Sequence, residues 1–167
     1  MALIVETGAG VTDAEAYASA SDLTAFAAKY GITLPAGDPA KEVLLRKGAD
    51  FLESLESRFK GSRVDSLQAL AWPRSDVFLF GATEALAAGT LPDALVKAQL
   101  QLACDAITVD LQPTGTGQEV VRKKVDVLEV EFAKRGSGSI IPELNKAMGI
   151  LAPLFNDGSF ALTSTRV

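Results

Sequence analysis

The sequence contains no histidine, one cysteine and one tryptophan among its 167 residues. Without histidine, the Ser–His and Cys–His nucleophile pairs of many hydrolases cannot form, and the commonest nitrogen ligand of zinc is missing. Cys104 cannot form an internal disulfide, and within the apolar stretch LVKAQLQLACDAI we expect a buried, unreactive thiol. These absences predict a protein with no catalysis, no metal site and no cofactor.

Long uninterrupted apolar runs are also missing. The most hydrophobic segment, residues 94–111, carries Lys97, Gln99, Gln101, Asp105 and Asp110, which would be costly in a bilayer. The start MALIVETGAG lacks the basic residues and the apolar length of a secretory signal, so we expect a soluble protein made in the cytoplasm. A net charge of −5 argues against general attraction to nucleic acid or to anionic membranes.

The composition fits one globular domain with a real core, since 48% of the residues are hydrophobic and 22% are charged. Apolar residues at helical spacing predict helices at 21–30, with Ser21 as cap and Gly31 as stop, and at 38–60, with Asp38 as cap, Pro39 at the first position and Gly61 as stop. A capping box at Thr90 predicts a helix over 90–111, and Pro142 begins a last one.

Residues 121–132 alternate apolar and charged side chains at period two, with a change of phase near Val127, which predicts a β-hairpin or kinked strand. The expected fold is mainly α: a small bundle of about four helices with a β-ribbon and extended terminal arms. We divide the single domain into an N-terminal arm, a helical core, the ribbon, a last helix and a C-terminal tail, at residues 1–20, 21–112, 119–133, 140–156 and 157–167.

Two sequence patterns resemble functional sites, a dinucleotide-binding loop and a paired-carboxylate site, but each has a simpler structural explanation. Gly8-x-Gly10 follows an apolar stretch as in dinucleotide-binding folds, but the third small residue of that fingerprint falls at Asp13, a carboxylate. Glu42, Glu53 and Glu56 could imitate a paired-carboxylate site, yet exposed carboxylates are the default on an amphipathic helix. We expect a solvated helix face there.

The best nucleic-acid candidate is the stretch around the single tryptophan, QALAWPRS. Single-strand binders combine cationic grooves with aromatic stacking platforms, and the candidate contacts here, with Trp72 as platform, are Arg58, Lys60, Arg63 and Arg74. One ring and a few cations on an acidic protein make a thin platform. The favoured interpretation is that Trp72, placed before Pro73, ends a turn and fills the core beside Phe59.

The ribbon begins with three cations, Arg122, Lys123 and Lys124, and its second half carries Glu129 and Glu131. Lysines on an edge strand discourage unwanted pairing, which is one explanation of the cluster. Protein contact is the other, and we treat these five residues as a candidate protein-contact ribbon.

Taken in order, VETGAGVTDAEAYAS, ESRFKGSR, QALAWPRSDV, LPDALVKAQLQLACDA, VVRKKVDVLEVEF and LAPLF resemble the head-tail connector, or adaptor, proteins of tailed bacteriophages. Relatives are labelled DnaT-like single-stranded-DNA-binding proteins. The resemblance spans about Val5 to Phe155, and its most specific pieces are QALAWPR and VRKKVxxLEVEF.

The resemblance implies a structural protein of the virion neck, present in host cytoplasm during assembly. Identical subunits would form a ring, commonly dodecameric, that binds the portal protein, extends the DNA channel and docks the next tail component. An acidic chain suits a channel through which genomic DNA passes without sequence-specific binding. In this interpretation Trp72, Pro73 and Phe59 anchor the loop that runs from Arg74 to Thr90 and fix its direction. A fixed direction matters because a ring closes only if each subunit presents its contact surfaces at the correct rotation.

Two other hypotheses remain open at this point. A single-stranded-DNA-binding module is the alternative, and it predicts tryptophan quenching that weakens steeply with salt. A hydrolase of unusual type is the third, and no nucleophile–base pair can be proposed for it.

Overall fold

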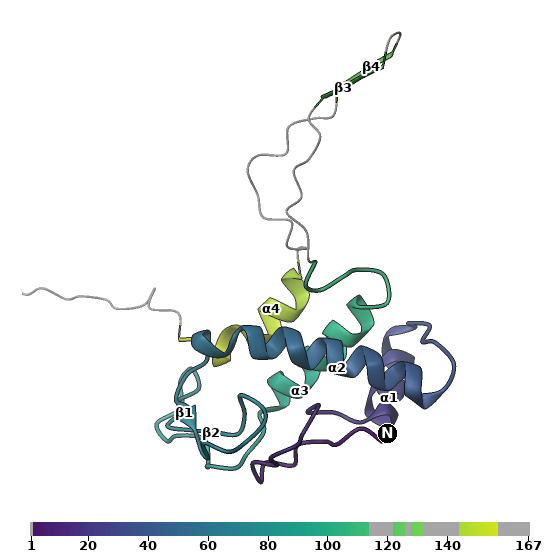
Figure 1. The fold of residues 1–167 in the computed structure, drawn as a ribbon. Helices are drawn as coiled ribbons and strands as arrows, with labels where there is room; N and C mark the ends of the chain where they lie inside the picture. Colours follow the sequence, from purple (N-terminus) through teal and green to yellow (C-terminus); the bar gives the residue numbers. More distant parts are fainter. Residues whose placement is uncertain (1, 114–121, 126–127, 132–143, 157–167) are drawn as a thin grey trace, which may run out of the picture.

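The structure is a computed structural model that describes residues 2–113, 122–125, 128–131 and 144–156. In chain order its elements are α1 (Ala20–Tyr30), α2 (Asp38–Ser54), the 3-10 helix η1 (Glu56–Arg58), β1 (Ser62–Arg63), β2 (Arg74–Ser75), α3 (Asp93–Asp105), β3 (Arg122–Val125), β4 (Leu128–Glu131), α4 (Asn145–Leu151) and the 3-10 helix η2 (Ala152–Leu154). The expected mainly helical fold, with four α-helices in the described part and a β-hairpin, is confirmed. Figure 1 shows α2 crossing the helical part, with α1 near its N-terminal end and the β1–β2 hairpin near its C-terminal end.

Helix α1 begins at Ala20, one residue before the predicted range, and its cap lies two residues before the predicted one. Its N-cap is Ser19, not Ser21: the Ser19 hydroxyl accepts from the backbone N–H of Asp22, and the Asp22 carboxylate accepts from the N–H of Ser19. This reciprocal pairing satisfies two donors that a helix start leaves open. The predicted stop is confirmed, because Gly31 adopts the left-handed conformation (φ 65°) and ends the helix.

Helix α2 begins at Asp38, so Asp38 lies inside the helix and does not cap it. The N-cap is Gly37, and Asp38 instead forms an ion pair with Lys41 at 3.2 Å. The helix also ends at Ser54, earlier than the predicted stop at Gly61. The apolar spacing continues past Ser54, but the chain there pairs with the C-terminal segment: the Lys60 N–H donates to the carbonyl of Leu154 (2.9 Å), and Phe59 forms an antiparallel bridge with Phe155.

Helix α3 is the central element and contacts α1, α2 and α4. It runs from Asp93 to Asp105 with Pro92 as N-cap, so neither the capping box at Thr90 nor the extension to Leu111 is correct. The crossing with α2 is close at Gly48, where an added Cβ would lie 3.1 Å from the carbonyl oxygen of Gln99. A glycine at this point lets the two helices approach.

The polar residue at the centre of the core is Gln99, which is fully buried. Its side-chain oxygen accepts from the N–H of Tyr17 (2.8 Å), and its amide nitrogen donates to the carbonyl of Leu45 (3.0 Å). The amide therefore ties the N-terminal arm to α2, and it pairs backbone groups that burial would otherwise leave open. The arm also folds back on itself, because Val5 forms a parallel bridge with Ala16.

Two antiparallel hairpins complete the described part of the chain. In the first, Ser62 pairs with Ser75 and Arg63 with Arg74. In the second, the candidate ribbon, Arg122 pairs with Glu131 and Lys124 with Glu129, so the sequence alternation correctly predicted a hairpin. The phase change at residues 126–127, the ends of the ribbon and the tail 157–167 lie outside the described residues. The last helix is shorter than predicted, from Asn145 to Leu151, followed by η2.

Candidate protein-contact site

Trp72 lies in the core and is fully buried. Its ring meets Phe59 edge-on, with centroids 5.8 Å apart and planes at 77°, and Phe59 stacks on Phe155 at 5.4 Å. The Trp72–Pro73 peptide is cis, and Pro73 is buried beside it. The aromatic set Phe59, Trp72 and Phe155, which we call the anchor cluster, joins the β1–β2 hairpin to the end of η2. Trp72 therefore offers no face on which a base could stack in this conformation.

Arg74 is 6% exposed, and its guanidinium stabilises the same hairpin. Nε donates to the carbonyl of Lys60 (2.8 Å), Nη1 to that of Ala71 (3.2 Å) and Nη2 to that of Gly61 (2.7 Å). Burial lowers the pKa of Arg74, and the carboxylate of Glu56, 3.7 Å from Nη1, acts in the opposite direction. The planar donor fork is thus occupied by backbone carbonyls of its own chain.

Arg63 pairs with Glu56 in a two-pronged contact, with Nε 2.6 Å from Oε1 and Nη2 2.7 Å from Oε2. A third donor, Nη1, reaches the carbonyl of Gln68 at 2.9 Å. The hydrogen bonds from Arg63 hold the pKa of Glu56 below its usual range. This pair sets the position of the loop inside the hairpin against η1.

The remaining candidate cations also contact protein groups. The ammonium of Lys60 donates to the carbonyls of Phe78 (3.2 Å) and Pro153 (2.9 Å), and the guanidinium of Arg58 lies 4.3 Å from the centre of the Phe155 ring. In the single-stranded-DNA hypothesis, Arg58, Lys60, Arg63 and Arg74 are the candidate nucleic-acid contacts. The structure does bring all four around one hairpin, but it engages each of them with carbonyls, a carboxylate or a ring.

Glu53 corrects the expectation of a solvated carboxylate face. Its Oε1 accepts from the hydroxyl of Tyr17 (2.7 Å), its Oε2 accepts from the N–H of Ala71 (2.7 Å), and burial raises its pKa. Burial likewise raises the pKa of Tyr17, whose hydroxyl accepts from the N–H of Trp72 at 3.2 Å. The expectation of a solvated face fails because the partners of Glu53 come from segments distant in sequence. The amphipathic pattern of α2 alone could not predict these contacts.

From this anchored base, the segment Asp76–Thr90, which we call the projecting loop, runs to the start of α3. Asp76 turns the chain with a left-handed φ of 58°, and Val77 is fully buried. Beyond it, Phe78 is 51% exposed and Phe80 is 98% exposed. Single exposed apolar residues are ordinary, but a phenyl ring left almost wholly in water at a loop tip is typical of a contact surface. Sequence reasoning identified the loop and missed these two side chains.

The Gly8–Gly10 segment contains an anion-binding arrangement that is already filled. The buried carboxylate of Glu6 accepts from the N–H groups of Gly8 (2.8 Å), Gly10 (3.0 Å) and Val11 (2.8 Å). These are the donors that a phosphate would need. The dinucleotide interpretation, already disfavoured by Asp13, therefore has no free backbone donors to support it at these three positions.

Replacing Glu6 with glutamine is expected to lower the free energy of unfolding by about 1–3 kcal/mol, because an amide NH₂ would face the Val11 N–H and leave this partly buried donor unpaired. Urea unfolding followed by circular dichroism measures the loss. Glu84→Gln, in the exposed part of the projecting loop, is the matched control and should change stability by no more than about 0.5 kcal/mol. Equal effects of the two substitutions would mean that the Glu6 contacts do not hold the arm.

The structure describes only the backbone pairing of the ribbon. A protein-contact role therefore stays a prediction for its five candidate residues, Arg122, Lys123, Lys124, Glu129 and Glu131. Within the described ranges, no group of three or more acidic or cysteine side chains could hold a metal ion. None of the helices in that same part of the chain has both the length and the apolar character to span a bilayer. Cys104 is buried, and burial raises the pKa of its thiol.

Comparison with known proteins adds one independent finding. A family model described as "Putative DnaT-like ssDNA binding protein" matches residues 1–167. No curated protein and no solved structure matches the chain.

Proposed function

The chain belongs to this DnaT-like family; because its motifs QALAWPR and VRKKVxxLEVEF resemble those of tailed-bacteriophage head-tail adaptors, we propose that it is a non-catalytic structural subunit of that kind. Identical subunits would form a ring in the virion neck that binds the portal protein, continues the DNA channel and docks the next tail component. The observation that carries the proposal is the projecting loop, with Phe80 98% exposed above a buried anchor. A surface of this kind serves contact with protein.

The charge of the chain supports the same proposal. Sixteen basic against 21 acidic residues leave a net charge of −5. A protein that neutralises few phosphates releases few counterions on contact with DNA and so binds it weakly. That property suits a channel wall along which genomic DNA must slide.

The proposal is tested by electron microscopy of the full chain, purified alone and mixed with the portal protein encoded in the same genome. Rings are expected in at least one of the two samples, with a central opening wide enough for duplex DNA. A chain that stays strictly monomeric in both samples would contradict the adaptor function.

A single-stranded-DNA-binding module is the second candidate, and it is supported by the description of the family. Because Trp72 is the only tryptophan, its fluorescence tests the form of this candidate in which a base stacks on Trp72, which is fully buried in the structure. We expect no quenching when an oligonucleotide is added at low salt. Quenching that weakens steeply as salt is raised would instead favour a stacking platform around Trp72.

A further inference from the structure

The tip of the projecting loop is a tight turn with Phe80 at its apex. The N–H of Ala82 donates to the carbonyl of Leu79 (3.0 Å), and Gly81 supplies the positive φ of 77°. Gly81 is the third residue of this four-residue turn, the position where a type II turn needs a positive φ. Nothing lies within 4 Å of a Cβ built on Gly81, and Phe80 itself is 98% exposed. The phenyl ring therefore stands away from its own subunit.

The base of the loop is held at several points, so the direction of the tip is defined. Val77 is fully buried, and its carbonyl accepts from the N–H of Leu86 at 2.8 Å. The carbonyl of Phe78 accepts from the ammonium of Lys60. A loop ordered in advance loses less conformational entropy when it docks.

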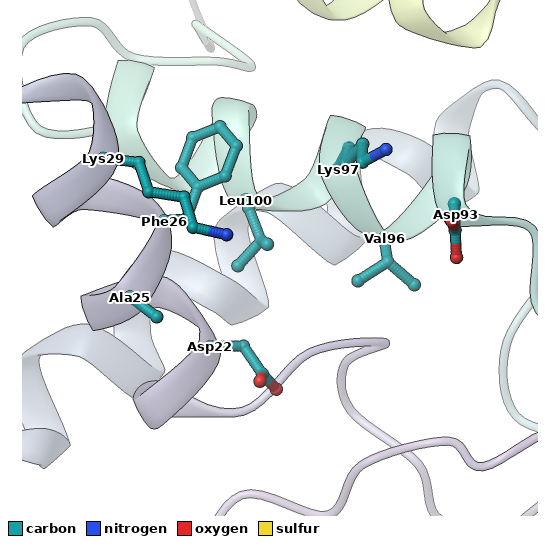
Figure 2. Close-up of a pocket in the computed structure, with 8 residues that line it drawn as sticks. All are labelled: Asp22, Ala25, Phe26, Lys29, Asp93, Val96, Lys97 and Leu100. Carbon is teal, nitrogen blue, oxygen red and sulfur yellow. The ribbon is translucent and has the colours of Figure 1, made fainter.

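A groove between α1 and α3 lies elsewhere on the same chain, and its volume is about 310 Å³. Ala25 and Phe26 of α1, with Val96 and Leu100 of α3, form its apolar part. Figure 2 shows Ala25 on α1, and Val96 and Leu100 on α3, directed into the space between the two helices. An aromatic side chain that fills such a pocket is the usual anchor of a protein interface.

Two lysines and two acids line the groove. Lys29 and Lys97 line the groove and have no ion pair with any other described residue, whereas the Asp22 carboxylate is engaged in the cap of α1. Asp93, the other acid at the rim, lies in the first turn of α3, where the helix dipole offsets its charge. The projecting loop carries two acids, Asp76 and Glu84, and no base. Lys29 and Lys97 could therefore pair with the two acids of the loop.

We propose that Phe80 of one subunit inserts between α1 and α3 of a neighbouring copy, with the acids of the projecting loop facing Lys29 and Lys97. The exposure of Phe80 shows that the ring does not occupy the groove of its own chain. A projection and a groove on different parts of one chain form a head-to-tail contact, which closes into a ring when the rotation permits. The inference rests on the proposed ring function and names the surfaces that would build it.

The test uses two variants of the full chain, Phe80→Asp without the projecting ring and Val96→Glu with a charge in the groove. Leu67→Asp is the matched control, because Leu67 is 72% exposed and lies in a different loop. Sedimentation velocity from micromolar to about 1 mM protein gives the assembly state. Circular dichroism and thermal unfolding establish that each variant is folded.

Wild type and Leu67→Asp are expected to associate alike, and each of the other two variants alone should associate roughly tenfold more weakly or stay monomeric. Mixed in equal amounts, these two should form a heterodimer and nothing larger, because one partner keeps the projection and the other keeps the groove. Rings that persist in both variants, or that lose only portal binding, would overturn this pairing and leave the adaptor function standing. A wild-type chain monomeric at about 1 mM, or a mixture without heterodimer, would also overturn it.

Discussion

Replacing Trp72 with alanine is expected to lower the free energy of unfolding by about 3–5 kcal/mol, the usual loss for a large aromatic residue in a packed core. The indole is fully buried and meets Phe59, which in turn stacks on Phe155. Removing it would leave a cavity where the hairpin joins the C-terminal end of η2. Both segments that hold the base of the projecting loop would then lose their common contact.

The loss is measured by urea unfolding followed by circular dichroism, since the variant has no tryptophan to report fluorescence. Trp72→Phe keeps a ring in the site and should lose clearly less stability. Leu67→Ala, on a side chain that is 72% exposed, is the surface control and should change stability by about 0.5 kcal/mol or less. A loss below about 1 kcal/mol for Trp72→Ala would mean that the indole contributes little to the packed core. That result would favour the alternative in which Trp72 stacks on nucleobases.

The helical architecture could be predicted from the sequence because it depends on local patterns. Apolar spacing located α1 and α2, local start signals placed α3 and α4 approximately, and the stop at Gly31 follows from the conformation of that one residue. The ends were less predictable. Leu55 and Phe59 continue the spacing of α2, yet the chain leaves the helix at Ser54 because Phe59 pairs with Phe155, almost a hundred residues away in sequence. A tertiary contact of this kind has no local signature.

The candidate site was predictable in part, and for the same reason. That Trp72 precedes a proline and follows apolar residues already favours a buried turn over an exposed platform. The role of Arg74 could not be derived, because its three acceptors are backbone carbonyls, and every residue type supplies these. Phe80 was missed because an aromatic residue between apolar neighbours is, in a sequence, indistinguishable from a core residue.

Replacing Gly61 with alanine is expected to cost roughly 2–5 kcal/mol, which combines the left-handed backbone with a direct clash. At a φ of 70°, the new Cβ would lie 2.0 Å from the carbonyl oxygen of Ser75 and 2.9 Å from a methyl group of Val77. The carbonyl of Gly61 also accepts from Arg74, so any shift of this residue disturbs the contact that closes the hairpin. The clash is with backbone and cannot be relieved by rotating a side chain.

Gly81→Ala separates the two contributions, because Gly81 has a similar φ of 77° with nothing within 4 Å of the new Cβ. It should lose about 1–2 kcal/mol, from the backbone conformation alone. The difference between the two variants in urea unfolding then measures the close approach of Gly61 to Ser75. If the two losses are equal, the hairpin yields to the added methyl group. A hairpin that yields could not hold the projecting loop at one fixed angle, and the proposed contact between copies would need a base other than Gly61 and Arg74.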